Sequence, residues 1–136
     1  MPADHSWDEE FRILRTRLWG HVTIDDIIRD ALKVYEDPRI HTPVQELIDL
    51  REVESTDVKI SDLRNLVQLN VSYAERFKGR HQALVAPTDE LHSMAQAFAT
   101  LSEVHLWPHL SRVFRTLPEA EDWLSSAGSE GNESAG

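Results

Sequence analysis

The chain has 136 residues and a formal net charge of −10 at pH 7, with 40% apolar and 28% charged residues. This length and composition predict one domain with one core, and the short apolar runs exclude a membrane span. The negative charge disfavours nucleic-acid binding, which needs clustered Lys and Arg, and the absence of cysteine excludes disulfides, thiol catalysis and thiolate metal sites.

The chain divides into three parts on composition. Residues 1–10 form an N-terminal segment with a short edge strand, residues 11–124 form a single α/β domain, and residues 125–136 are expected to be a disordered tail of Ser, Gly, Glu and Asn. No cationic start precedes an apolar segment, so a secretory signal is not visible and a cytoplasmic protein is expected.

The first expected elements are a hairpin and a helix. Branched and aromatic residues predict a strand over 11–19, with residues 6–7 as an antiparallel partner and Gly20 ending the strand. Thr23 is a candidate cap for the following helix, whose first turn carries Asp25 and Asp26, and Asp37 with Pro38 closes that helix. Apolar residues at three- and four-residue spacing predict one buried helical face.

A central strand and a second helix follow. Leu47 and Ile48 are adjacent apolar residues on a short strand, so they point to opposite faces and predict helices on both sides of the sheet. Ser61 is expected to cap the next helix, and Gly79 to end it. Asn70 falls within the apolar stripe of this helix, where it is either a hydrogen-bonded core amide or part of a ligand pocket.

Two further strand and helix units complete the pattern. Residues 82–86 predict a strand followed by a helix capped by Thr88, and residues 112–115 predict a last strand before a capping box at Thr116 and Glu119. The fold class predicted is therefore α/β, with a mixed, mostly parallel sheet of four to five strands and about four helices.

Reactive constellations are weak in this sequence. His105 and His109 have the spacing of two ligands on a helix, but Pro108 lies between them, so a loop or interface role is favoured over a metal site. Asp25 and Asp26 point about 100° apart on a helix and suit its positive end better than acid/base chemistry. No nucleophile elbow or glycine-rich loop is present, so no catalytic residue, metal or cofactor is predicted and the protein is expected not to be an enzyme.

Several short motifs occur in a characteristic order. They are Gly-His-Val-Thr at 20–23, Ile-Asp-Leu-Arg at 48–51, Ala-Leu-Val-Ala-Pro at 83–87, and Val-Phe-Arg at 113–115 followed by Trp-Leu at 123–124. Over about residues 11–124 the chain resembles the STAS superfamily, in its small SpoIIAA-like bacterial branch, which is related in fold to the lipid-binding CRAL-TRIO proteins. The resemblance implies helices packed mainly on one side of the sheet, and regulation or ligand sensing rather than turnover.

The resemblance also implies where a switch would lie. The best-understood members carry a phosphorylatable Ser directly after an Asp, at the start of the helix after the central strand. In this chain Asp57 matches the Asp, but Val58 occupies the acceptor position and Ile60 replaces the small residue that usually follows. The neighbouring hydroxyls are those of Ser55, Thr56 and Ser61, and a phosphate added there would meet the free N–H groups of a helix start.

Two hypotheses of different class remain. The first is a non-enzymatic regulatory module that binds an unidentified protein partner through the loop and helix after the central strand, with the candidate residues Ser55, Thr56, Asp57, Ser61, Arg64 and Gln68. The second is a sensor or carrier of a small apolar molecule or lipid, with a cleft near Trp19, Asn70, Trp107 and Phe114. The edge of the first hairpin makes a homodimer a further expectation.

Overall fold

The computed structural model describes residues 2–38, 45–73, 80–106 and 110–135. Its centre is a five-stranded sheet with the strand order β1-β2-β3-β4-β5. Strand β1 (Ala3–Asp8) lies at one edge and runs antiparallel to β2 (Ile13–Val22). Strands β3 (Gln45–Thr56), β4 (His81–Val85) and β5 (Leu110–Phe114) continue the sheet in parallel with β2.

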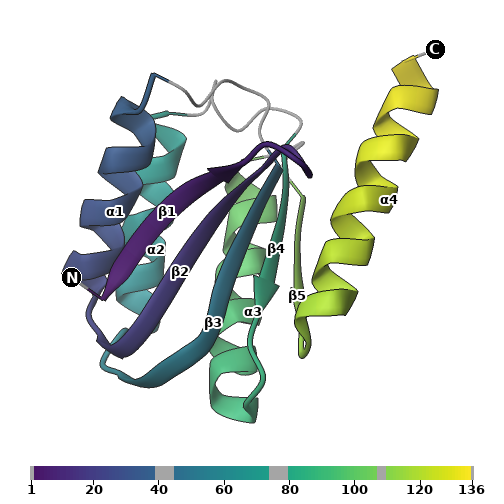
Figure 1. Cartoon of the computed structure of the whole chain (residues 1–136). Coiled ribbons are helices and arrows are strands. Elements are labelled where there is room, and N and C mark those ends of the chain that lie inside the picture. The colour runs from purple at the N-terminus through teal and green to yellow at the C-terminus, as the bar shows by residue number, and fades with distance from the viewer. Residues whose placement is uncertain (1, 39–44, 74–79, 107–109, 136) are drawn as a thin grey trace.

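Four helices cover the sheet unequally. Helices α1 (Ile24–Glu36), α2 (Ile60–Val71) and α3 (Asp89–His105) lie on one face, and α4 (Leu117–Ala135) lies on the other (Figure 1). The mixed, mostly parallel α/β architecture predicted from the sequence is therefore confirmed. We refer to the two sides of the sheet as the three-helix face and the α4 face.

The central strand supplies both cores, as its two adjacent apolar residues predict. Ile48 packs on the three-helix face with Leu66, Leu84 and Phe98, whereas Leu47 packs on the α4 face with a separate group. That second group includes Ala83, Val85, Ala120 and Leu124. Side chains alternate between faces along a strand, so one short strand can be buried on both sides only when helices cover both.

The predicted caps at three helix starts are confirmed. Thr23 Oγ1 accepts the Asp26 N–H at 3.2 Å, and Asp26 Oδ2 accepts the Thr23 N–H at 3.0 Å, which completes a capping box. This bond from the Thr23 backbone is the largest of several that hold the pKa of the Asp26 carboxyl below its usual value of 3.8. Thr88 caps α3, and the hydroxyl of Thr116 caps α4.

The start of α2 differs from the prediction. Lys59, rather than Ser61, is the N-cap residue, because the helix begins two positions earlier than the hydroxyl suggests. Asp62 Oδ2 accepts the Lys59 N–H at 2.9 Å and supplies the stabilisation expected from a cap side chain. Val58, just before this start, is buried, so packing of an apolar residue sets where the helix begins.

The sequence predicted that Gly20 ends the second strand, and this prediction is wrong. Strand β2 continues to Val22, and its register with β3 shifts at two places between Arg17 and His21. Gly20 has a φ of +67°, a backbone conformation that costs glycine little and other residues more. The glycine therefore marks a bulge that bends the strand without interrupting it.

The C-terminal segment also differs from expectation. Leu124 is the last residue of α4 in the core of the α4 face, and Ser125 and Ser126 are exposed. The helical backbone nevertheless continues through Ala135, where a disordered tail was predicted from residue 125. Extension of a helix that is already nucleated needs no further packing.

Candidate functional site

The carboxyl end of β3 carries the first of the predicted partner-binding residues. The exposed Ser55 has its Oγ 2.7 Å from His21 Nδ1, on the neighbouring strand. Thr56 Oγ1 donates to the Val22 carbonyl at 2.7 Å and accepts the Val58 N–H at 3.2 Å. Both hydroxyls thus have hydrogen-bond partners within the chain, and Thr56 connects the ends of β2 and β3.

The remaining predicted partner-binding residues share one exposed surface. Asp57 is exposed in the loop, and Ser61, Arg64 and Gln68 are exposed on α2. The spacing of three and four residues places these three side chains on one side of the helix. Ile60, a large apolar residue, is 51% exposed beside them. The structure thus places Ser61, Arg64 and Gln68 on the outer face of α2, with Asp57 in the loop before this helix.

The residues predicted to form one cleft do not come together. Asn70 lies on the three-helix face, whereas Phe114 packs on the α4 face against Trp123, with ring centroids 5.8 Å apart. Trp19 lies under the guanidinium of Arg17, which is 4.5 Å from its ring centroid. Trp107 lies outside the described residues. The sheet separates Asn70 from Phe114, so these two residues cannot line one cleft.

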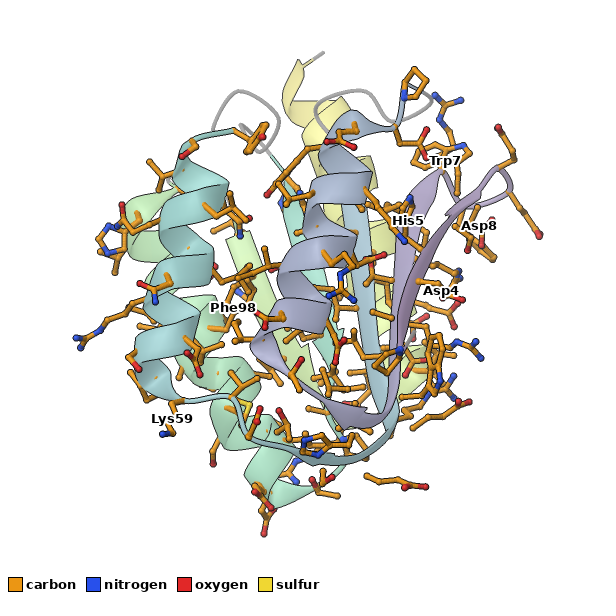
Figure 2. The ribbon with its side chains drawn as sticks, turned by 90° about the vertical axis from the view of Figure 1, so that its left-hand side faces the viewer. Asp4, His5, Trp7, Asp8, Lys59 and Phe98 are labelled. Atoms are coloured by element: carbon orange, nitrogen blue, oxygen red, sulfur yellow. The ribbon has the colours of Figure 1, made fainter. Side chains whose placement is uncertain are left out.

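The structure instead contains an apolar cavity of about 110 Å³ on the three-helix face. Residues of β2, β3 and β4 form its floor, and α1, α2 and α3 supply Ile27, Leu63 and Phe98 to its walls. Figure 2 looks onto this face, with Phe98 visible between α1 and α2. Helix α2 packs against α3, and α1 packs against β1, which leaves the cavity between α1 and α2.

A second, polar pocket of about 70 Å³ adjoins the apolar cavity. Six residues line both spaces: Thr16, Ile27, Asp30, Ile48, Leu66 and Phe98. The polar pocket adds Tyr35, Asn70, Glu46, Arg80 and Gln82 to its lining. We call the two spaces together the amphipathic cavity, because one end is apolar and the other end carries buried polar and charged side chains.

A buried hydrogen-bond network forms the floor of the polar end. Glu46 and Arg80 are each 5% exposed, and they form an ion pair. Glu46 is the second residue of β3, and Arg80 directly precedes β4. Gln82 Nε2 donates to Glu46 Oε1 at 2.7 Å, and Thr16 Oγ1 donates to Glu46 Oε2 at 3.2 Å. Ser111 extends the network from β5 through a 2.9 Å bond to Gln82 Oε1.

Burial changes the acidity of the arginine in this network. It lowers the pKa of the Arg80 guanidinium from its usual value to about 10, because the charged form loses hydration. This value is still well above neutrality, so Arg80 is charged at pH 7 and its charge is matched by the Glu46 carboxylate. The pair thus brings no net charge to the cavity.

Asp30 of α1 forms part of the wall between the two ends of the cavity. Its side chain is 5% exposed, and its Oδ1 lies 3.1 Å from His5 Nδ1. The other nitrogen of this imidazole, Nε2, lies 3.4 Å from Asp37 Oδ2. Figure 2 shows His5 on β1 beside α1, so these contacts attach the edge strand to the helix that covers the cavity.

Two tyrosines connect the carboxyl ends of α1 and α2. The buried Tyr35 hydroxyl donates to Asn70 Oδ1, and its ring stacks on Tyr73 with centroids 4.1 Å apart. Asn70 is 6% exposed, so the prediction that it lies buried within the apolar stripe is confirmed. It is both a hydrogen-bonded core amide and a lining residue of the polar pocket.

Across residues 2–38, 45–73, 80–106 and 110–135, no group of three or more His, Asp or Glu side chains could hold a metal ion. His105 is exposed at the end of α3, and His109 lies outside the described residues. In the same described ranges, no helix combines the length and apolar character required to cross a membrane.

Sequence reasoning missed most of the polar end of the cavity. Glu46 shares its strand face with Ile48, and Gln82 shares its strand face with Leu84, so period-two alternation places both polar side chains inward. That signal was available in the sequence. No local signal pairs Arg80 with Glu46 or His5 with Asp30, because these partners are 34 and 25 residues apart.

The fold and cavity define a small α/β domain with an amphipathic cavity on one face of its sheet. No protein-family model and no curated protein matches the sequence. Among solved structures, the chain is similar to an uncharacterized protein of the DUF3478 family with a SpoIIAA-like fold from Shewanella loihica PV-4, with a TM-score of 0.57 and 18% sequence identity. The alignment covers 88% of this chain and 90% of that chain. The SpoIIAA-like fold expected from the sequence is thus confirmed, and identity this low shows the fold alone.

Proposed function

We propose that this protein is a non-enzymatic binding module that holds a small amphipathic molecule in the amphipathic cavity. The observation that carries this proposal is that the apolar and polar spaces adjoin each other, with six lining residues in common. Ligand pockets typically combine an apolar lining with a few polar groups that orient the bound molecule. The combination of Ile27, Leu66 and Phe98 with Asp30 and Asn70 matches this description.

The cavity volume limits the size of the ligand. The two spaces measure about 110 and about 70 Å³, and a dry cavity of roughly 150 Å³ can hold a molecule the size of benzene. A ligand of about six to eight non-hydrogen atoms therefore fits without rearrangement. Small ligands of this size gain about −5 kcal/mol in total, which corresponds to a Kd on the order of 0.1–1 mM.

The test begins with native mass spectrometry of the protein purified from its own host, followed by variants of α3. Ala95 lines the apolar cavity, so Ala95→Met fills it with a flexible side chain. We expect this variant to lose the co-purifying molecule, while Thr100→Met, at an exposed position of the same helix, retains it. Circular dichroism establishes that both variants fold. Retention of the molecule by a folded Ala95→Met variant would contradict the proposal.

The second candidate function is regulation through a protein partner, bound at the loop after β3 and the outer face of α2. The exposed Ile60 beside Arg64 and Gln68 favours it, because large apolar residues are enriched where partners bind. Helix α2 also contributes Leu63 and Leu66 to the cavity wall, so an occupied cavity would act on the helix that carries this surface. Such a connection would make the module a ligand sensor.

Charge reversal tests the second candidate. We expect the double variant Asp57→Arg, Arg64→Glu to abolish a stoichiometric complex seen by native mass spectrometry, while Glu90→Lys at an exposed position of α3 leaves it intact. A complex that survives the double reversal would contradict this use of α2. A cytoplasmic location and a homodimer stay predictions of the sequence.

A further inference from the structure

We infer that the ligand is a short alcohol or amine, whose head group donates a hydrogen bond to Asp30, and that a carboxylate of the same length is excluded. This inference rests on the proposed function, since it specifies the chemistry of the molecule in the amphipathic cavity. It follows from the hydrogen bonds that Asp30 does and does not make, and from the balance of charges around the polar pocket.

Asp30 presents an acceptor to the cavity. Its Oδ1 contacts His5 Nδ1 at 3.1 Å, whereas its Oδ2 has no hydrogen-bond partner among the residues that the structure describes. The side chain is 5% exposed and lines both the apolar and the polar space. Asp30 Oδ2 is not among the fully buried side-chain atoms without a partner, so it is accessible to a bound molecule, and both an alcohol and an ammonium group can donate a hydrogen bond to it.

The charges around the pocket favour the same head groups. Glu46 and Arg80 neutralise each other, and Gln82 and Thr16 donate further hydrogen bonds to the Glu46 carboxylate. Asp30 is the remaining acidic side chain in the pocket lining. On its outer side, His5 lies between Asp30 and Asp37, so this group is negative in total whether or not the imidazole is protonated. A bound carboxylate would therefore face a like charge within a poorly hydrated space.

The apolar end determines the rest of the molecule. Ile27, Leu66 and Phe98 continue directly from Asp30 toward the apolar cavity, so an alkyl chain attached to the head group has a continuous apolar path. The two spaces of about 110 and about 70 Å³ together suit a chain of about six carbons with its head group, by comparison with the roughly 150 Å³ cavity that holds benzene. Hexan-1-ol, hexylamine and hexanoate thus form a series of six-carbon molecules that differ at the first carbon, which carries a hydroxyl group, carries an ammonium group or belongs to a carboxylate.

The experiment measures the binding of these three molecules to the full chain by isothermal titration calorimetry at pH 7. We expect hexan-1-ol and hexylamine to bind at least tenfold more tightly than hexanoate. Because the protein carries a net charge of −10, the titrations are run in 0.15 M NaCl, where exposed charges attract hexylamine only weakly. Hexanoate binding as tightly as hexan-1-ol would overturn the inference.

Variants of two aspartates on α1 locate the effect. Asp30→Asn should weaken hexylamine binding about tenfold and bring hexanoate within a few-fold of it, while Asp25→Asn, at an exposed position, should leave all three affinities unchanged. If Asp30→Asn does not fold, the ranking of the three molecules on the unaltered protein still decides. Failure of the proposed function looks different, because then none of the three molecules binds and filling the cavity with Ala95→Met changes nothing.

Discussion

The buried ion pair between Glu46 and Arg80 leads to the strongest stability prediction. Each side chain is 5% exposed, and Glu46 also accepts hydrogen bonds from Gln82 and Thr16. Replacing Glu46 with Leu leaves the Arg80 charge buried without its carboxylate, which costs about 3–5 kcal/mol. Replacing Arg80 with Met costs about 3 kcal/mol, near the lower end of that range, because Glu46 retains two other donors.

The double variant Glu46→Leu, Arg80→Met removes both charges together. It leaves the donors of Gln82 and Thr16 without the carboxylate, so we expect a net cost of about 1–3 kcal/mol, well below the sum of the single variants. The double-mutant cycle should therefore give a coupling free energy of at least about 2 kcal/mol. Urea denaturation followed by circular dichroism measures each free energy of unfolding.

An exposed ion pair is the matched control for this cycle. Arg51 Nη2 lies 2.8 Å from Asp49 Oδ2, but the Arg51 side chain is 47% exposed. We expect Arg51→Met to change the free energy of unfolding by less than about 1 kcal/mol. The reasoning about burial would be refuted if the losses in free energy of unfolding of the two single variants added up to that of the double variant. A loss for Glu46→Leu as small as that of the control would also refute it.

Three further predictions concern individual hydrogen bonds. Tyr35→Phe should lower the free energy of unfolding in urea by about 1–3 kcal/mol, because buried Asn70 Oδ1 loses its donor; an unchanged midpoint would contradict this. Thr23→Ala should cost about 1 kcal/mol by the same measurement, whereas Ser61→Ala should cost less than about 0.5 kcal/mol because Ser61 is not the cap; equal costs would contradict the structure. The lowered pKa of Asp26 contributes stability that is present above the unfolded value of 3.8 and is lost as pH falls through the lower folded value. The thermal midpoint of Asp26→Asn should accordingly vary less than that of the unaltered protein between pH 5 and 2, and parallel curves would count against this role.

Much of the fold could be predicted because its signals are local. Thr23 and Thr88 are cap residues whose hydrogen bonds span three positions, and the paired faces of Leu47 and Ile48 follow from strand alternation. The wrong expectations occurred where local signals compete. Ser61 is a good cap residue, but burial of Val58 starts the helix earlier, and Gly20 permits a bulge as readily as the end of a strand.

The candidate site was only partly predictable. Asn70 was identified because an amide within an apolar helical stripe needs a partner, and the outer face of α2 follows from helical spacing. Phe114 was wrongly grouped with Asn70, because an aromatic residue on a short apolar strand fits either face equally well. Asp30 was overlooked, since an acidic residue within an amphipathic helix ordinarily faces water.

The sequence by itself determined the class of fold, since the order of the strands and helices and the apolar faces depend on residues a few positions apart. Only the tertiary structure decided that Glu46 meets Arg80, that His5 meets Asp30, and that an apolar and a polar space join between α1 and α2. These contacts depend on which strands become neighbours and how far apart two helices lie on the sheet. Such distances arise from the packing of the whole chain and have no counterpart in any short stretch of it.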